Sequence, residues 1–266
     1  TTPQYQLLAR PNVAQLSLPM AQPLSQSQRE EAAARWGPKW QAYAQPLVGV
    51  LLGGHTWPFR FTHRHAKNLA EHLSQRPGFF LITSSRRTPD SALKVLSKKL
   101  GDRCWVYHWQ PKHDDNPYPA MLSLCDELLV TGDSAMMLAE ASVSGIPTAF
   151  FSLPPRQSLS WFIPAGWLTA WRRREIAQSR SLGPTSQQSF LSRWVNQLID
   201  WGWLSPHRDF EALHHTIITQ QLAQKIDVTN NSLTTDSVQA IQQHKPSDLA
   251  FALSKVRRKL YSGQVL

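Results

Sequence analysis

Cysteine is scarce in this sequence, because the 266 residues include only Cys104 and Cys125. Two thiols are too few for a disulfide framework, and no CxxC pair provides the ligand spacing of a zinc knuckle. A reducing compartment is therefore the simplest setting, and we expect a cytoplasmic protein.

Long apolar runs are also missing, since none approaches the roughly 20 residues that a membrane-spanning helix needs. The first residues contain no charged segment followed by an apolar stretch, so no signal peptide is visible. The first residue is Thr1 rather than Met, and we expect a fragment or a processed form. Only 17% of the residues are charged and 41% are hydrophobic, which excludes a highly charged disordered chain and indicates a soluble globular protein.

Positive charge is in excess, with 28 Lys and Arg against 18 Asp and Glu and a formal net charge of +10. This excess favours an anionic partner: nucleic acid, an anionic membrane or a phosphorylated small molecule. Because no recognition-helix or RNP pattern is present, we expect no nucleic-acid partner.

The chain opens with a lead-in segment, residues 1–45, that is rich in Pro and Gln. Ser27 and Glu30 have the spacing of a capping box, which predicts a linker helix over residues 27–43.

Short apolar runs alternate with amphipathic segments between residues 46 and 155. Five strands are predicted, at residues 47–52, 79–83, 104–109, 127–131 and 148–153. Four helices are predicted between them, at residues 63–75, 89–100, 119–125 and 134–144. Buried strands separated by helices indicate an α/β fold, a doubly wound parallel sheet of five to six strands with right-handed crossovers.

No further strand is predicted after residue 155. Helical patterns over residues 189–201, 210–225 and 247–260 indicate a helical C-terminal region. We therefore expect three parts: the lead-in at 1–45, a Rossmann-like domain at 46–155 and the helical region at 156–266.

The segments that follow the first two predicted strands carry candidate ligand-binding residues, since ligands of an open parallel sheet bind beyond the carboxyl ends of its strands. Gly53 and Gly54 permit close backbone approach or a positive φ, which a phosphate cradle and any tight turn both need. Hydroxyl and guanidinium groups follow the second strand at Ser84, Ser85, Arg86 and Arg87. These groups suit phosphate oxygens, but a capped helix with two solvated arginines would have the same sequence.

The segment after the fourth predicted strand carries the strongest signal. Thr131, Gly132, Asp133 and Ser134 join a glycine turn to an N-cap residue, which predicts an anion-accepting helix N-terminus. Glu140 follows in an otherwise apolar helix, where sugar hydroxyls would be suitable partners for its carboxylate. A surface position or an ion pair with an arginine would also explain Glu140.

Several catalytic and metal-binding patterns are missing. The sequence has no GxGxxG, no Walker loop, no HExxH and no GxSxG. Residues 113–115 place a His beside two Asp, but without a further acidic cluster we expect a solvated loop and no metal site.

Aromatic and basic residues gather between residues 160 and 174, at Trp161, Trp167, Trp171, Arg172, Arg173 and Arg174. This combination suits an anionic membrane interface or a partner surface. Ordinary core tryptophans beside a solvated basic helix end would give the same pattern.

Four stretches occur in the order and spacing of one known family: GGHTWPFRF, ITSSRRTP, NPY and VTGDSAMMLAEASVSGIP, which begin at residues 53, 82, 116 and 130. With them the chain resembles the mitochondrial fission "elongated mitochondria" family, as a bacterial-type member of the kind often labelled nucleoside-diphosphate-sugar epimerase. The epimerase label is disfavoured, because the GxGxxG and Tyr-x-x-x-Lys pattern of those enzymes is absent.

The resemblance implies a glycosyltransferase-B-like fold, with residues 46–155 similar to its nucleotide-sugar-binding half and residues 1–45 as the remnant of an N-terminal Rossmann-like half. It implies a nucleotide sugar as substrate and no further cofactor, and it names no catalytic residue. Ser134 and Gly132 would lie near the diphosphate, Glu140 on the ribose and the Asn116 loop near the base. The implied ligand-binding set is Gly53, Gly54, Ser84, Ser85, Arg86, Arg87, Asn116, Tyr118, Thr131, Gly132, Asp133, Ser134, Met137 and Glu140.

We therefore expect a nucleotide-sugar-binding, glycosyltransferase-like protein whose acceptor is unknown, a membrane-associated acceptor included. The alternative is a non-enzymatic adaptor or a membrane-peripheral scaffold, attached to an anionic surface at the inner membrane face or to a protein partner.

Overall fold

The computed structural model describes residues 2–5, 16–56, 59–111, 115–153 and 208–226, and singly Trp171, Arg173, Arg174, Arg193, Trp194 and Gln197. Six parallel strands form one sheet in the order β3-β2-β1-β4-β5-β6. The strands are β1 Leu47–Leu51, β2 Phe79–Thr83, β3 Cys104–Tyr107, β4 Glu127–Thr131, β5 Thr148–Phe151 and β6 Gln224–Ile226. The predicted doubly wound α/β fold is thereby confirmed.

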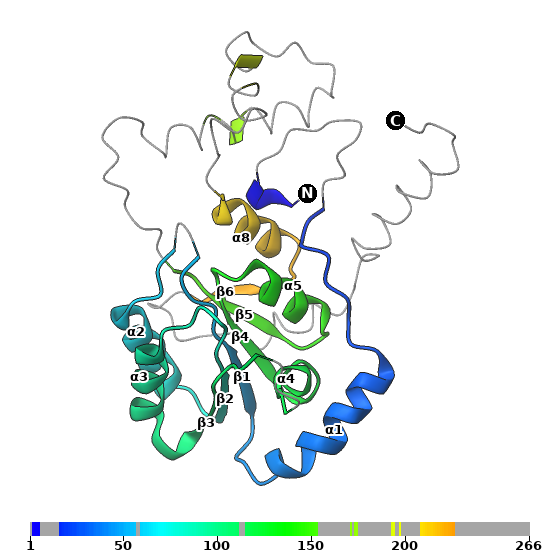
Figure 1. Cartoon of the computed structure of the whole chain (residues 1–266), viewed down its shortest axis with the longest axis vertical. Helices are drawn as coiled ribbons and strands as arrows, with labels where there is room; N and C mark the ends of the chain where they lie inside the picture. Colours follow the sequence, from blue (N-terminus) through cyan, green and yellow to red (C-terminus); the bar gives the residue numbers. More distant parts are fainter. Residues whose placement is uncertain are drawn as a thin grey trace.

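Helices cover both faces of the sheet (Figure 1). The helices are α1 Gln26–Trp40, α2 His63–Ser74, α3 Asp90–Leu100, α4 Tyr118–Leu124, α5 Ala135–Val143 and α8 Phe210–Thr219. Right-handed crossovers place α2 and α3 on one face and α4 and α5 on the other, because the strand order runs outward from β1 in both directions. With both faces covered, every residue of β1 and β2 is buried, which explains their continuous apolar sequence.

The lead-in helix α1 begins at Gln26, one residue before its predicted range, and its N-cap lies two residues before the predicted one. Ser25, not Ser27, is the N-cap, and its partner in the capping box is Gln28 rather than Glu30. Both serines have an acceptor-capable residue three positions later, so the spacing alone does not choose between them.

Tryptophans fix α1 to the rest of the fold. The rings of Trp36 and Trp40 lie 5.5 and 6.3 Å from the ring of Trp105 on β3. Both α1 tryptophans are buried, so the lead-in helix contributes to the same hydrophobic core as the sheet.

The prediction that no strand follows residue 155 is wrong, because β6 pairs with β5 at the edge of the sheet. The predicted helix 210–225 ends at Thr219, and Gln221 adopts a left-handed φ of 55° that stops the helix. The next residues form β6, whose Lys225 lies opposite Phe150. A strand of three residues is too short to show an alternating hydrophobic pattern in the sequence. Its formation depends on pairing with β5.

Other boundaries differ by a few residues. The third predicted strand, 104–109, ends at Tyr107, because its partner β2 ends at Thr83 and leaves nothing to pair with beyond it. The predicted helices at 189–201 and 247–260 lie largely or wholly outside the described residues. Within the described ranges, no helix combines the length and the apolar character that crossing a bilayer requires.

Candidate functional site

The loops that follow β1 and β4 meet where the strand order reverses, between β1 and β4. The amide of Gly53 donates to Oγ1 of Thr131 at 2.6 Å, and the amide of Gly54 donates to Oδ2 of Asp133 at 2.7 Å. The sequence predicted all four residues for a ligand site. They lie together at the switch point, which is where open α/β sheets bind ligands.

Neither Gly53 nor Gly54 has a positive φ, so an unusual backbone conformation does not explain these glycines. They are needed because neighbouring loops lie very close to their Cα atoms. A Cβ on Gly53 would lie 2.4 Å from Oδ1 of Asp133, and one on Gly54 would lie 2.0 Å from the carbonyl oxygen of Arg87. Side chains at these two positions would push apart the loops that follow β1, β2 and β4.

The loop after β2 holds the β1 loop through its hydroxyl groups. Ser85 donates to the carbonyl of Gly53 at 2.8 Å, and Thr88 donates to the carbonyls of Leu52 and Gly53. The hydroxyl of Ser84 accepts a hydrogen bond from the amide of Trp109 at 2.8 Å. These predicted ligand residues therefore hold neighbouring loops in place.

Arg86 and Arg87 differ from the two serines beside them. Both are exposed at this edge of the sheet. Their guanidinium groups are accessible to an anionic ligand, while the backbone of Arg87 accepts a hydrogen bond from the amide of His55 at 3.3 Å.

Asp133 is almost entirely buried, with 1% of its surface exposed. Besides Gly54, the hydroxyl of Thr56 donates to its Oδ2 at 3.3 Å, while Oδ1 has no partner among the described residues. Burial raises the pKa of Asp133, and the hydrogen bond from Gly54 together with the charge of Arg87 opposes that rise. The carboxyl group thus connects two loops and favours its neutral form more than an exposed aspartate does.

His214 of α8 reaches the same switch point, and the sequence analysis missed it. Its Nε2 lies 2.7 Å from the carbonyl oxygen of Gly132. A carbonyl only accepts, so Nε2 carries the hydrogen. The ring is buried beside Phe150, with 4.6 Å between ring centroids, and burial lowers its pKa. Adjacent histidines at 214 and 215 match no motif, so only the fold brings this contact to light.

Glu140 is held by Tyr118, the first residue of α4. The hydroxyl of Tyr118 donates to Oε2 of Glu140 at 2.5 Å, and burial followed by the charge of Glu140 raises the pKa of Tyr118 far above its usual range. The backbone amide of Tyr118 also donates to Oδ1 of Asn116 at 3.1 Å. Glu140 is half-buried rather than exposed, and no arginine of the described residues forms an ion pair with it.

The N-terminus of α5 lies just after the β4 loop. Ser134 occupies the N-cap position and is buried, and its side chain makes no capping hydrogen bond. Met137, one turn further on, is half-buried.

Of the aromatic and basic segment, Trp161, Trp167 and Arg172 lie outside the described residues. Trp171 is half-buried and Arg174 is exposed. Arg173 forms ion pairs with Asp209, at the N-cap of α8, and with Glu211 at 2.8 Å. These acidic partners, Asp209 first, raise the pKa of Arg173, so its charge is already compensated within the chain.

The predicted solvated loop at 113–115 is described only at Asp115. That residue forms an ion pair with Arg35 of α1, whereas His113 and Asp114 lie outside the described residues.

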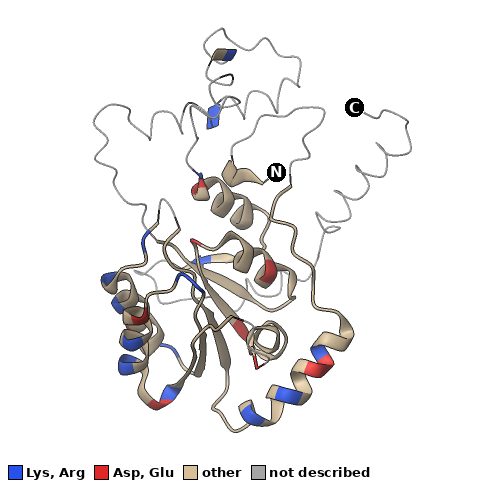
Figure 2. Cartoon of the chain, in the orientation of Figure 1, with Lys and Arg blue, Asp and Glu red and all other residues tan. Residues whose placement is uncertain are grey.

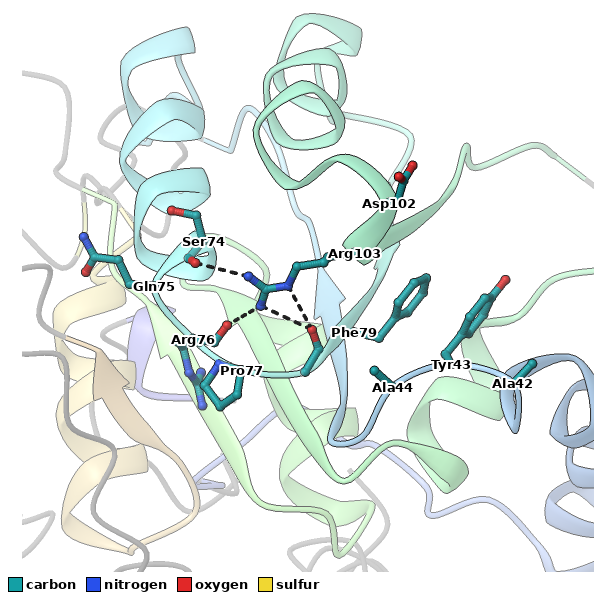
Figure 3. A pocket seen from close by; sticks show the side chains of 11 residues that line it. Ala42, Tyr43, Ala44, Ser74, Gln75, Arg76, Pro77, Phe79, Asp102 and Arg103 are labelled. Atoms are coloured by element: carbon teal, nitrogen blue, oxygen red, sulfur yellow. Dashed lines mark hydrogen bonds between the residues drawn. The ribbon is translucent and has the colours of Figure 1, made fainter.

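A groove of about 700 Å³ lies at the opposite edge of the sheet, where β1, β2 and β3 begin (Figure 3). Tyr43 and Phe79 stack in it with 3.9 Å between ring centroids. Arg103 donates to backbone carbonyls of residues 74, 76 and 78, and so caps the end of α2. None of the predicted ligand-binding residues lines this groove.

Comparison with known proteins gives two relatives that each match less than half of this chain. Mitochondrial fission protein ELM1 of Arabidopsis thaliana is 35% identical over 124 residues, which cover 44% of this chain and 28% of that protein. Uncharacterized protein RP120 of Rickettsia prowazekii (strain Madrid E) is 29% identical over 126 residues, which cover 46% of this chain and 36% of that protein. The matches thus span about a third of the length of these two relatives.

A solved structure, Phytolacca americana UGT2 complexed with UDP-2fluoro-glucose and pterostilbene, aligns with 91% of this chain and 46% of its own, at 13% identity and a TM-score of 0.35. The family described as mitochondrial fission ELM1 matches residues 4–161, which is more than half of the chain. The chain belongs to the mitochondrial fission ELM1 family.

Proposed function

We propose that the chain binds a nucleotide sugar at the switch point between β1 and β4, as a glycosyltransferase-like protein. The observation that carries the proposal is the hydrogen bond from Tyr118 of α4 to Glu140 of α5, the helix that follows the β4 loop at this switch point. Glu140 lies six residues after Ser134, which is about 9 Å along a helix axis. That span is comparable with the one between the diphosphate and the ribose of a nucleotide.

The diphosphate would lie at the N-terminus of α5. Backbone amides at a helix N-terminus point at an anion, and the helix dipole favours negative charge there. The hydroxyl of Ser134 caps no amide of its own helix, so it is available as a donor. Arg86 and Arg87 supply exposed positive charge on the loop after β2, where their planar guanidinium groups match phosphate geometry.

The ribose would lie beside Glu140. Tyr118 engages Oε2, and a carboxylate with one oxygen held in place can accept hydrogen bonds from sugar hydroxyls with the other. Asn116 lies two residues before the start of α4 and is exposed, so it would lie at the side of the base.

Calorimetric titration of the chain with a panel of UDP-, GDP- and dTDP-sugars tests the proposal. We expect saturable binding of at least one of them. Glu140→Ala should lower the affinity about tenfold or more, because a hydrogen bond to a charged group is lost, and Arg87→Ala should lower it as well. Binding of no member of the panel by a folded protein would refute the proposal.

Matched control variants separate the site from general effects. Asp102, between α3 and β3, and Lys39, in the last turn of α1 before β1, are exposed and lie in segments that lead into the amino ends of strands, at the edge of the sheet opposite the switch point. Asp102→Ala and Lys39→Ala should leave the affinity unchanged. If all four variants behave alike, the assigned site is wrong even if a nucleotide binds.

The competing proposal is a non-enzymatic adaptor that uses the fold for partner binding. The Arabidopsis relative is named for mitochondrial fission and not for a reaction, which favours such a role. Binding of a nucleotide sugar without hydrolysis or transfer to any acceptor would fit an adaptor that a nucleotide sugar regulates.

A further inference from the structure

Positive charge is unevenly distributed along the described chain. Residues 59–103 contain ten Lys or Arg and three Asp or Glu. The remaining described residues contain eight Lys or Arg and nine Asp or Glu. The excess of positive charge in the described part therefore comes from the segment that includes α2 and α3.

These two helices lie side by side on one face of the sheet, and in Figure 2 both carry several Lys and Arg positions, coloured blue. Arg64 and Lys67 are three residues apart on α2, and Lys94 and Lys98 are four apart on α3. Side chains at these spacings share one side of a helix. All four are exposed, so both helices direct basic groups to solvent.

One ion pair joins the two helices. Lys99 of α3 lies 2.8 Å from Glu71 of α2. The hydrogen bond and the charge of Lys99, with a smaller effect of Lys67, lower the pKa of Glu71. The other acidic residues of the segment, Asp90 and Asp102, lie at the two ends of α3, so they leave the middle of the surface uncompensated.

We call this surface the basic face, and it consists of Arg60, Arg64, Lys67, Lys94, Lys98, Lys99 and Arg103. Helices of 12 and 11 residues are each about 17 Å long, and packed helices are separated by about 10 Å. The basic face is thus a broad surface about two helices wide rather than a single projecting element.

The helices on the other face of the sheet have a different character. The helix α4 carries no charged residue and α5 carries only Glu140. The exposed charges of α1 are of both signs, with Glu30 and Glu31 followed by Arg35 and Lys39 (Figure 2). The basic face is therefore a property of one side of the sheet.

We infer that the basic face docks on the surface of a lipid bilayer that contains anionic headgroups, a step that does not depend on the proposed nucleotide site. Basic side chains near such a surface contribute about 1 kcal/mol each. None of the large hydrophobic side chains that are exposed in the described ranges lies on α2 or α3. The contact is therefore electrostatic and lies at the headgroups, without insertion of side chains into the hydrocarbon.

The same observations disfavour nucleic acid as the occupant. Single-stranded nucleic acid is bound through exposed aromatic rings on which bases stack, and α2 and α3 expose none. Lysine supplies four of the seven charges of the basic face, and its compact ammonium group suits diffuse attraction better than the bidentate contacts of arginine.

Vesicle flotation of the chain tests this inference, with phosphatidylcholine vesicles that do or do not contain phosphatidylglycerol. We expect binding only to the anionic vesicles and loss of that binding when the salt concentration rises from about 0.1 M to about 1 M, where the Debye length falls to about 3 Å. The triple variant Lys67→Gln, Lys94→Gln, Lys98→Gln should bind about tenfold or more weakly. Its thermal unfolding should match that of the unchanged chain, because the three side chains are exposed.

Two further triple variants serve as controls. Lys39→Gln, Arg174→Gln, Lys225→Gln removes the same charge away from the basic face, and its binding should change much less. Arg172→Gln, Arg173→Gln, Arg174→Gln tests the aromatic and basic segment. The inference is overturned if the chain does not bind anionic vesicles, or if binding is lost only in the triple variant at residues 172–174. It is also overturned if duplex or single-stranded DNA competes for the basic face at lower concentrations than the vesicles.

Discussion

The hydroxyl of Tyr118 donates to Oε2 of Glu140 across 2.5 Å, so the first residue of α4 holds a carboxylate halfway along α5. This contact joins two helices on the same face of the sheet. It also orients the only charged side chain of α5.

Tyr118→Phe should lower the free energy of unfolding by about 1.5 to 3 kcal/mol, since a half-buried carboxylate loses its donor. Glu140→Gln keeps an oxygen that accepts from Tyr118 and should cost less. Urea denaturation measures both. An unchanged free energy in Tyr118→Phe would show that the contact contributes nothing to stability in solution.

The close approach at Gly54 makes that position intolerant of any side chain. Gly54→Ala would place a Cβ 2.0 Å from a backbone oxygen, and we expect a loss of about 2 kcal/mol or more. Gly37 in α1 has nothing within 4 Å of an added Cβ, so Gly37→Ala should stabilise the protein by about 0.5 to 1 kcal/mol through helix propensity. Thermal and urea unfolding of the two variants should therefore differ in sign.

The buried ring of His214 should make stability depend on pH. Burial lowers its pKa below the usual 6.5, so the unfolded chain takes up a proton more readily than the folded one. The free energy of unfolding should therefore fall as the pH falls below about 6.5. His72 is buried and its pKa is lowered in the same direction, so it contributes to the same slope.

Variants can assign that slope. His214→Gln can still donate to the carbonyl of Gly132 but does not titrate, and urea denaturation over a pH series should give it a shallower slope. His215 is the exposed neighbour, and His215→Gln should keep the original slope. Equal slopes in the two variants would contradict the role assigned to His214.

Asp133 should couple nucleotide binding to proton uptake. Its pKa is already raised by burial, and a diphosphate at the N-terminus of α5 would raise it further, because a nearby anion disfavours the charged carboxylate. Affinity should thus increase as the pH falls toward that raised pKa. Calorimetry in two buffers of different ionisation enthalpy detects the proton, and Asp133→Asn should abolish its uptake. Uptake that persists in Asp133→Asn would assign the proton to another group.

Local sequence predicted the central strands well for a physical reason. Strands covered on both faces need continuous apolar residues, and β2 and β4 begin and end at their predicted residues. Helix starts were less certain, as the choice of Ser25 over Ser27 shows. Predicted ligand residues such as Gly53, Thr131 and Asp133 lie together, because the carboxyl ends of parallel strands share one edge.

Contacts between distant segments could not be predicted in this way. The pairing of β6 with β5 and the contact of His214 with Gly132 both join residues that are far apart in the chain. The NPY stretch pointed to Tyr118, but its partner Glu140 became apparent only from the packing of α4 and α5. Likewise the basic face consists of charges that are scattered in the sequence and meet only because α2 and α3 are neighbours.

The edge position of β6 has a consequence for synthesis. While the ribosome adds the residues between Phe151 and Gln224, the strand β5 has no partner on its outer edge. At about 5 to 20 residues per second this interval is on the order of ten seconds. The exposed edge consists of Thr148, Ala149, Phe150 and Phe151, which is the kind of short apolar strand that pairs with other chains. The nascent protein therefore carries an apolar strand edge that its own last strand covers only after residues 224–226 have been synthesised.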